Sequence, residues 1–164
     1  MARLFIAVIP PDEVVEQLTT LHRKDQRGVR FVRSENWHIT LRFLGDADPG
    51  EVIDALDRVG LGSATARLGP AVDVLAERAL ILPVHGLDDL AASVGAATQH
   101  IGEPASKRFL AHLTVARINP RVPMPRALGV LFSAEFDVED IALVSSRLAA
   151  DGARYEQLQT WPVG

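Results

Sequence analysis

A short segment occurs twice in this chain, and its repetition is the strongest constraint on the fold. Trp37-His38-Ile39-Thr40-Leu41 is echoed 74 residues later by Ala111-His112-Leu113-Thr114-Val115. The two copies divide the chain into halves of similar make-up, which predicts two related lobes. In a β-strand alternate side chains point to opposite faces, so each histidine shares a face with its threonine while the aliphatic residues face the core. We therefore expect two strands that present polar pairs toward one cleft.

Apolar periodicity predicts strands and helices around these segments. Strands are expected over residues 3–9, 66–76, 79–84, 107–118, 132–138, 141–148 and 154–161, with two more inside 29–44. Helices are expected from Pro11 to about Lys24, over 49–59 and over 87–101. The order favours an α+β protein with two pseudo-symmetric lobes of antiparallel sheet, helices on the outer faces and a central cleft. No linker separates the halves, so residues 1–164 should form a single two-lobed domain.

Composition and charge narrow the function classes. The 164 residues are 48% hydrophobic and 23% charged, which is typical of a globular protein. Cysteine is absent, which excludes disulfides, thiolate metal sites and cysteine nucleophiles. The apolar run at residues 4–9 is too short to span a membrane and lacks a small-residue cleavage site, so we expect a cytoplasmic protein without a membrane partner.

The formal net charge of −4 argues against a protein that coats nucleic acid through a broad basic surface. A nucleic-acid substrate would have to be bound locally, at an end. We accordingly expect no extended nucleic-acid surface, and a monomer.

The two histidines suit the opening of a cyclic phosphodiester. Water must lose a proton as it attacks phosphorus, and the departing ribose oxygen on the far side must gain one. His38 and His112 can serve both needs, because the ordinary pKa of histidine is roughly 6.5. The hydroxyls of Thr40 and Thr114 would donate hydrogen bonds to the non-bridging phosphate oxygens. This scheme requires no metal and no cofactor, and no cluster with metal-ligand spacing lies near either segment.

A structural interpretation competes with this one, because a lone histidine in a strand is usually a partnered structural residue. Two copies of an apolar-flanked His-x-Thr in one short chain favour paired chemistry instead. The remaining histidines, His22, His85 and His100, are interpreted as surface or capping residues. The Gly60-x-Gly62 segment lacks the third glycine of a dinucleotide fingerprint, so a nucleotide-cofactor site is not expected there.

The paired motifs His38-Ile39-Thr40-Leu41 and His112-Leu113-Thr114-Val115 resemble the two signature tetrapeptides of the two-histidine phosphoesterases. Within that superfamily the chain is most similar to the RNA 2′,3′-cyclic phosphodiesterases, also called 2′-5′ RNA ligases. The similarity extends to the flanks at residues 3–8, 36–45 and 145–161. It implies a bilobal fold and hydrolysis of RNA 2′,3′-cyclic phosphate ends to a 2′-phosphomonoester, with 2′-5′ ligation as the reverse reaction.

The resemblance also implies roles for individual residues. The catalytic pair would be His38 and His112, the phosphate would be bound by Thr40, Thr114 and Arg117, and the terminal base would stack on Phe43. Since the family leaves a 2′-phosphate, the 3′ oxygen departs. The resemblance then favours His38 as the acid that protonates this oxygen and His112 as the base that activates water.

Strand parity complicates two of these roles. Phe43 and Arg117 each follow a histidine by five residues, which places them on the opposite face unless the strand ends or bulges first. From the residues alone, Arg42 has the parity expected of a phosphate or rim contact.

The chain departs from the family pattern at two places. Ala111 stands where the family commonly has a proline, and Leu80-Ile81-Leu82 stands where an aromatic is often found. The second departure predicts a more open or more aliphatic wall on the base side. Two other functions stay open: a phosphodiesterase for a small cyclic phosphate or short oligoadenylate, and a non-catalytic RNA-end binding module. Retention of both histidines argues against the binding module.

Overall fold

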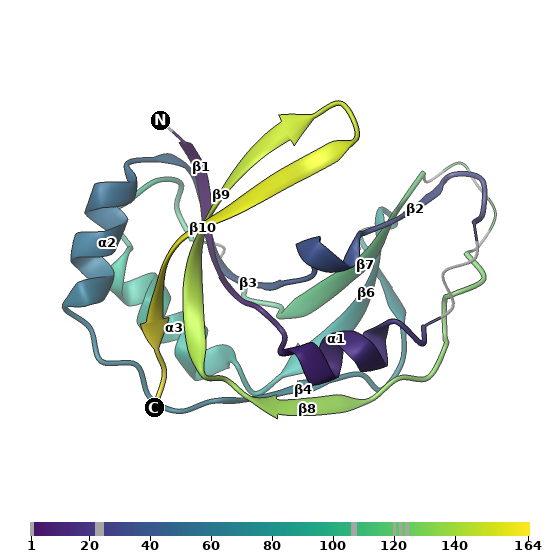
Figure 1. Ribbon diagram of the computed structural model, residues 1–164, viewed down its shortest axis with the longest axis horizontal. Coiled ribbons are helices and arrows are strands. Elements are labelled where there is room, and N and C mark those ends of the chain that lie inside the picture. Colours follow the sequence, from purple (N-terminus) through teal and green to yellow (C-terminus); the bar gives the residue numbers. More distant parts are fainter. Residues whose placement is uncertain (1, 22–24, 106–107, 120, 122, 124) are drawn as a thin grey trace.

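The computed structural model describes residues 2–21, 25–105, 108–119, 121, 123 and 125–164, which form two lobes of antiparallel sheet with helices on their outer sides (Figure 1). The elements in order are β1 (Ala2–Val8), α1 (Asp12–Leu18), β2 (Val29–Phe31), a 3₁₀ turn η1 (Ser34–Asn36), β3 (Ile39–Ala47), α2 (Pro49–Asp57), β4 (Thr65–Leu68), β5 (Asp73–Leu75), β6 (Ala79–His85), α3 (Asp88–Ala97), β7 (His112–Ile118), β8 (Ala134–Asp137), β9 (Asp140–Ala149) and β10 (Gly152–Pro162).

The strands join in the order β10-β9-β1-β3-β7-β6-β4-β8, with β2 on β7 and β5 on β6. Strands β3 and β7 meet at one residue pair, Ile39 with Leu113, so each belongs mainly to its own lobe. The two strands of the repeated segments, β3 and β7, therefore lie side by side where the lobes join (Figure 1). This topology confirms the predicted α+β class with two related antiparallel lobes.

Helices cover the outer faces and begin where local chemistry favours them. Helix α3 packs on β3, α2 packs on α3 and β10, and α1 packs on β8 of the other lobe. Helix α2 has Pro49 in its first turn, and the Asp48 carboxylate accepts a hydrogen bond from the Gly50 amide at 3.1 Å. Within the described ranges, no helix is both long and apolar enough to cross a membrane.

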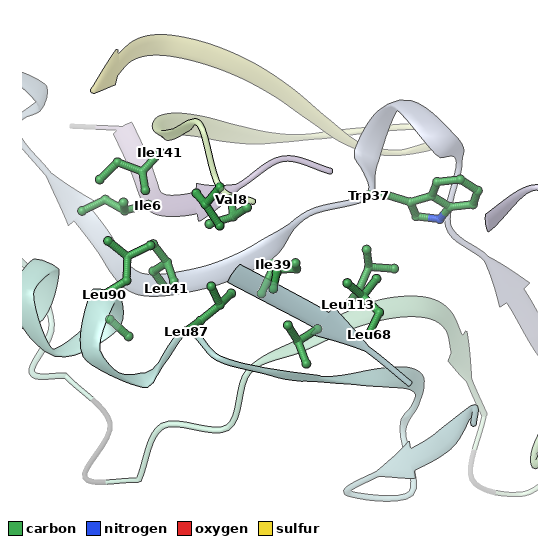
Figure 2. Close-up of a cluster of buried hydrophobic side chains, with 14 of the residues drawn as sticks. Ile6, Val8, Trp37, Ile39, Leu41, Leu68, Leu87, Leu90, Leu113 and Ile141 are labelled. Atoms are coloured by element: carbon green, nitrogen blue, oxygen red, sulfur yellow. The ribbon is translucent and has the colours of Figure 1, made fainter. Parts of the chain in front are cut away.

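The aliphatic residues of both repeated segments are buried in a core shared by the two lobes. Figure 2 shows Ile39 and Leu113 close together, with Leu87 and Leu68 nearby. Because these alternate residues face inward, the histidine and threonine beside them face away from the core, as the repeat predicts.

Both central strands carry a β-bulge at the same place relative to their histidine. The extra residue is Leu41 in β3, opposite β1, and Val115 in β7, opposite β6. In each strand the residues flanking the extra one pair with adjacent residues of the neighbouring strand. A bulge reverses the alternation of side chains beyond it. The internal symmetry thus extends from the sequence motif to the backbone.

Several predicted boundaries are wrong in informative ways. The expected strand over 66–76 is two strands, β4 and β5, interrupted at Gly69-Pro70, because proline cannot donate to a ladder. Helix α1 ends at Leu18, and the predicted end at Lys24 lies outside the described residues. His38 is expected inside a strand but directly precedes β3. The strand expected over 107–118 begins only at His112, as β7. The last hairpin turns one residue earlier than Asp151-Gly152, since Gly152 already pairs with Ala149.

Arg42, beyond the first bulge, faces the core side of β3 and is only 3% exposed. Its guanidinium donates to the carbonyl oxygens of Ile101 at 3.0 Å and Phe43 at 2.9 Å, and to the Thr98 hydroxyl at 3.3 Å. These contacts link β3 to the segment that follows α3, where carbonyl groups are left without helical partners. Arg42 is therefore a structural residue.

Replacing Arg42 should destabilise the fold. Arg42→Met leaves buried carbonyl groups unsatisfied, at about 1–3 kcal/mol each, so we expect the free energy of unfolding to fall by about 2–4 kcal/mol. Urea denaturation followed by circular dichroism measures the change. Arg58→Met, at an exposed position just after α2, should alter stability by less than about 0.5 kcal/mol. Equal effects from both variants would contradict the structural role.

Candidate active site

The two repeated histidines are held by the same local geometry. The Nδ1 atom of His38 lies 2.8 Å from the carbonyl oxygen of Asn36, and that of His112 lies 2.8 Å from the carbonyl oxygen of Leu110. A carbonyl oxygen only accepts, so Nδ1 must carry the proton and donate in both rings. Each neutral ring then presents an unprotonated Nε2, the atom through which protons can be exchanged.

A cavity of about 290 Å³ lies beside His38 and is lined by β2, β7, the turn before β3 and the β9–β10 hairpin. It brings together three residues expected from the sequence, His38, Thr114 and Arg117. His112 and Thr40 are half-buried neighbours that do not line this cavity. His112 is nevertheless close enough for its charge to lower the pKa of His38.

His38 lies in an aromatic environment that sequence reasoning missed. Its ring centroid lies 4.7 Å from that of Phe5 and 5.3 Å from that of Tyr155, the latter edge to face. Burial lowers the pKa of His38 below its ordinary value, the hydrogen bond to Asn36 opposes this, and Arg117 lowers it further. His38 is therefore predominantly neutral at neutral pH in the free protein. Only the chain's tertiary pairing of β1, β9 and β10 reveals these partners.

The bulge in β7 resolves the parity difficulty for Arg117. Val115 and Ala116 are both buried, after which the exposed Arg117 returns to the face of His112 and Thr114. Arg117 consequently lines the cavity and contributes to the electrostatic environment of His38.

The bulge in β3 has the same effect on its neighbours. Phe43 is 42% exposed, and the Arg3 guanidinium lies 5.3 Å from its ring centroid. The expectation that Arg42 contacts phosphate from a matching face is wrong, because the extra residue Leu41 turns Arg42 inward and Phe43 outward. Phe43 does not line the cavity beside His38, so it offers an aromatic surface outside that cavity.

His85 and His100 lie outside the lining of the cavity. His85 and His100 are exposed, while His22 falls outside the described residues. No group of three or more histidine, aspartate or glutamate side chains in the described part of the chain is arranged to hold a metal ion.

The cavity carries positive charge despite the net charge of −4 on the whole chain. Three arginines line it, Arg30, Arg33 and Arg117, with one carboxylate, Asp151. Two proton-exchanging imidazoles beside such a cationic cavity can bind a phosphate ester and transfer protons to and from it. The two-lobed fold and this pair of histidines have the architecture of the two-histidine phosphoesterases.

Comparison with known proteins supports this class. A family model described as LigT-like phosphoesterase matches residues 8–68. The RNA 2′,3′-cyclic phosphodiesterase of Thermus thermophilus is 32% identical over 179 aligned residues, which cover 96% of this chain and 88% of the relative. The enzyme of the same name from Archaeoglobus fulgidus is 28% identical, with 97% of this chain and 99% of the relative covered.

Solved structures agree with this assignment. A Thermus thermophilus protein superposes with a TM-score of 0.79 at 29% identity, covering 98% of this chain and 97% of its own. Escherichia coli LigT in complex with 3′-AMP gives a TM-score of 0.79 at 27% identity, covering 99% and 98%. The chain belongs to the LigT-like phosphoesterase family.

The environment of His38 can be tested without a substrate. Arg117→Gln should raise the pKa of His38, because it removes a positive charge that disfavours the imidazolium form. Two-dimensional ¹⁵N–¹H NMR of the histidine side chains reports both this titration and the proton on Nδ1. Arg58→Gln removes the same charge from a distant surface and should leave the titration unchanged. A His38 ring protonated on Nε2 when neutral would contradict the hydrogen-bond assignment.

Proposed function

We propose that this protein hydrolyses RNA 2′,3′-cyclic phosphate ends to 2′-phosphomonoesters, with His38 and His112 as its acid and base. The observation that carries the proposal is the matched pair of hydrogen bonds from Nδ1 to a carbonyl oxygen, since they leave both Nε2 atoms to exchange protons. The substrate class is supported by the relatives named RNA 2′,3′-cyclic phosphodiesterase.

In the proposed reaction, a bond forms between a water oxygen and phosphorus while the bond from phosphorus to the ribose 3′ oxygen breaks. Nε2 of His112 takes the proton of the water, and Nε2 of His38 donates a proton to the departing 3′ oxygen. The hydroxyls of Thr40 and Thr114 donate to non-bridging oxygens, and the Arg117 guanidinium offsets their negative charge. These groups supply both proton transfers and the charge stabilisation, so the scheme uses no metal.

The acid role makes a specific demand on His38. Burial lowers the pKa of His38 in the free protein, so its proton is held weakly before substrate binds. A bound cyclic phosphate brings a negative charge next to the ring, which favours the imidazolium form. Substrate binding therefore recruits the proton that the leaving oxygen needs.

Further parts of the proposal follow from the same site. The proposal also takes the monomer as the acting unit and the cytoplasm as the place of the reaction. The exposed Phe43 ring would stack on the terminal base. By microscopic reversibility, the pair also joins a 5′-hydroxyl end to a cyclic phosphate as a 2′-5′ linkage, but excess water favours hydrolysis.

A small cyclic phosphate nucleotide is the second candidate substrate. The cavity of about 290 Å³ lies at the small end of the range for ligand sites and has room for about one nucleotide. Escherichia coli LigT has also been crystallised with 3′-AMP and with NADP⁺, both of which carry a phosphate on ribose. Comparing turnover of an RNA oligonucleotide and of a nucleoside 2′,3′-cyclic phosphate separates the two candidates.

The central test is turnover in excess chelator. An RNA that ends in a 2′,3′-cyclic phosphate should be hydrolysed at a nearly unchanged rate in EDTA, because the histidines perform both proton transfers. ³¹P NMR should place the phosphate of the product on the 2′ oxygen. Loss of activity that zinc, manganese or magnesium restores would rule out the two-histidine scheme.

Removing either imidazole should abolish most turnover. His38→Ala or His112→Ala should each lower kcat by about 10²–10⁴-fold, while Thr40→Ala and Thr114→Ala cost less. The double histidine variant should fall well short of the product of the single effects, because the pair acts as a unit. His85→Ala is the matched control and should retain full activity. A histidine variant with near-normal turnover would reassign that histidine to a structural role.

The pH dependence distinguishes the two roles. Burial lowers the pKa of His38 in the free protein, so kcat/KM should begin to decline with rising pH below the ordinary histidine pKa of roughly 6.5. In the complex the negative substrate favours the imidazolium form, so the descending limb of the kcat profile should lie at higher pH. A substrate with a far better leaving group at the 3′ position needs little protonation, so it should rescue His38→Ala and not His112→Ala. Rescue of His112→Ala alone would reverse the roles, and rescue of neither would mean that the histidines only position the phosphate.

A further inference from the structure

Two arginines lie directly opposite each other beside the active site. Arg30 of β2 pairs with Arg117 of β7 in an antiparallel ladder, so their side chains share one face with Cβ atoms about 5 Å apart. Like charges in this arrangement repel each other, and both residues line the cavity. In a chain of net charge −4, this concentration of cations at one place indicates an anion site larger than a single phosphate contact.

The tip of the β9–β10 hairpin contacts Arg30 and Arg33 through Asp151. The Arg30 guanidinium donates to the backbone carbonyl of Asp151 at 2.8 Å. One carboxylate oxygen of Asp151 lies 2.8 Å from Arg154 and 3.7 Å from Arg33. Arg33 is additionally paired with Glu35 at 3.3 Å. These contacts join the hairpin tip to β2 and to the turn that precedes His38.

Gly152 favours this close approach. Its φ of +122° lies in the region that favours glycine, and a Cβ built on it would lie 2.8 Å from the Arg30 guanidinium. The hairpin therefore presents its backbone carbonyl, with its two lone pairs, to a guanidinium that has further N–H groups to donate.

A bound phosphate can replace the carboxylate in the ion pairs at the hairpin tip. The Arg33 and Asp151 side chains are 43% and 56% exposed, and ion pairs at such exposure contribute little to stability. A phosphodiester offers guanidinium groups a bidentate partner of the same charge. The carboxylate of Asp151 thus occupies a place beside Arg33 that a phosphate can take.

We propose that Arg30 and Arg33 form a second phosphate site, which binds the phosphodiester on the 5′ side of the terminal nucleotide, and that Asp151 occupies it in the free protein. The inference rests on the proposed function and narrows its substrate to an RNA chain. If Arg117 holds the cyclic phosphate, Arg30 lies one strand away, at about 4.8 Å between neighbouring strands. The phosphate one nucleotide along the chain then meets Arg30 and Arg33.

Four substrates separate this site from the catalytic centre. They are a nucleoside 2′,3′-cyclic phosphate, the same nucleotide with a 5′-phosphate, a dinucleotide with a 2′,3′-cyclic phosphate end, and that dinucleotide with an uncharged methylphosphonate linkage. The unmodified dinucleotide should exceed the nucleoside and the methylphosphonate in kcat/KM by at least about tenfold. The 5′-phosphate compound shows whether a terminal phosphate monoester suffices.

Variants assign the effect to residues. Arg30→Gln and Arg33→Gln should each remove most of the dinucleotide advantage, so kcat/KM should fall by several-fold more for the dinucleotide than for the nucleoside substrate. Arg58→Gln removes the same charge from a distant surface and should preserve the advantage. Asp151→Asn acts in the opposite direction, since it removes one of the two carboxylates paired with Arg33, and should lower KM for the dinucleotide by about two- to fivefold. Thermal unfolding of each variant checks the fold, and the exposed Arg33 keeps the test available if Arg30→Gln is unstable.

The outcomes are distinct. Equal kcat/KM for the nucleoside, the dinucleotide and its methylphosphonate would overturn the second phosphate site while leaving the proposed function intact. Parallel losses on all four substrates in the arginine variants would also overturn it, because these residues would then act on the catalytic centre. Absence of turnover with every substrate would overturn the proposed function, and this inference with it.

Discussion

The β-bulge three residues after each repeated histidine decides which side chains face the cleft. Without the bulges at Leu41 and Val115, strict alternation would place Arg42 on the face of the histidines and turn Arg117 toward the core. With them, a buried arginine supports the end of α3, and an exposed arginine reaches the cavity beside His38. Both lobes use the same device at the same distance from their histidine, so the site inherits the symmetry of the fold.

The site depends equally on the backbone carbonyl groups that hold the two histidine rings in place. Each ring donates Nδ1–H to a carbonyl two residues earlier, which orients Nε2 without any side-chain partner. The backbone provides this restraint, so the motif itself needs only histidine, threonine and aliphatic anchors. His38 lines the cavity and contacts the rings of Phe5 and Tyr155, which breaks the symmetry between two otherwise similar groups.

Positive charge is concentrated at the cavity of a chain whose net charge is negative. A net charge of −4 argues against a broad basic surface, yet Arg30, Arg33 and Arg117 line one cavity. They come together there because β2 pairs with β7, and the tip of the β9–β10 hairpin lines the same cavity. This arrangement suits an enzyme that binds the end of an RNA and not its length. Asp151, whose pKa is lowered by its own backbone amide and by Arg154 and Arg33 against the opposing effect of desolvation, stays ionised and partners those arginines.

The sequence by itself determined the duplication, the α+β class, the two histidines and their inward-facing aliphatic neighbours, because these follow from residue types and strand periodicity within a few positions of each other. It could not determine where β3 and β7 bulge, since a bulge depends on pairing with β1 and β6. It also could not bring Phe5, Tyr155, Arg30 and Asp151 to the cleft. Those contacts arise from pairings between residues far apart in the chain, which local periodicity does not encode.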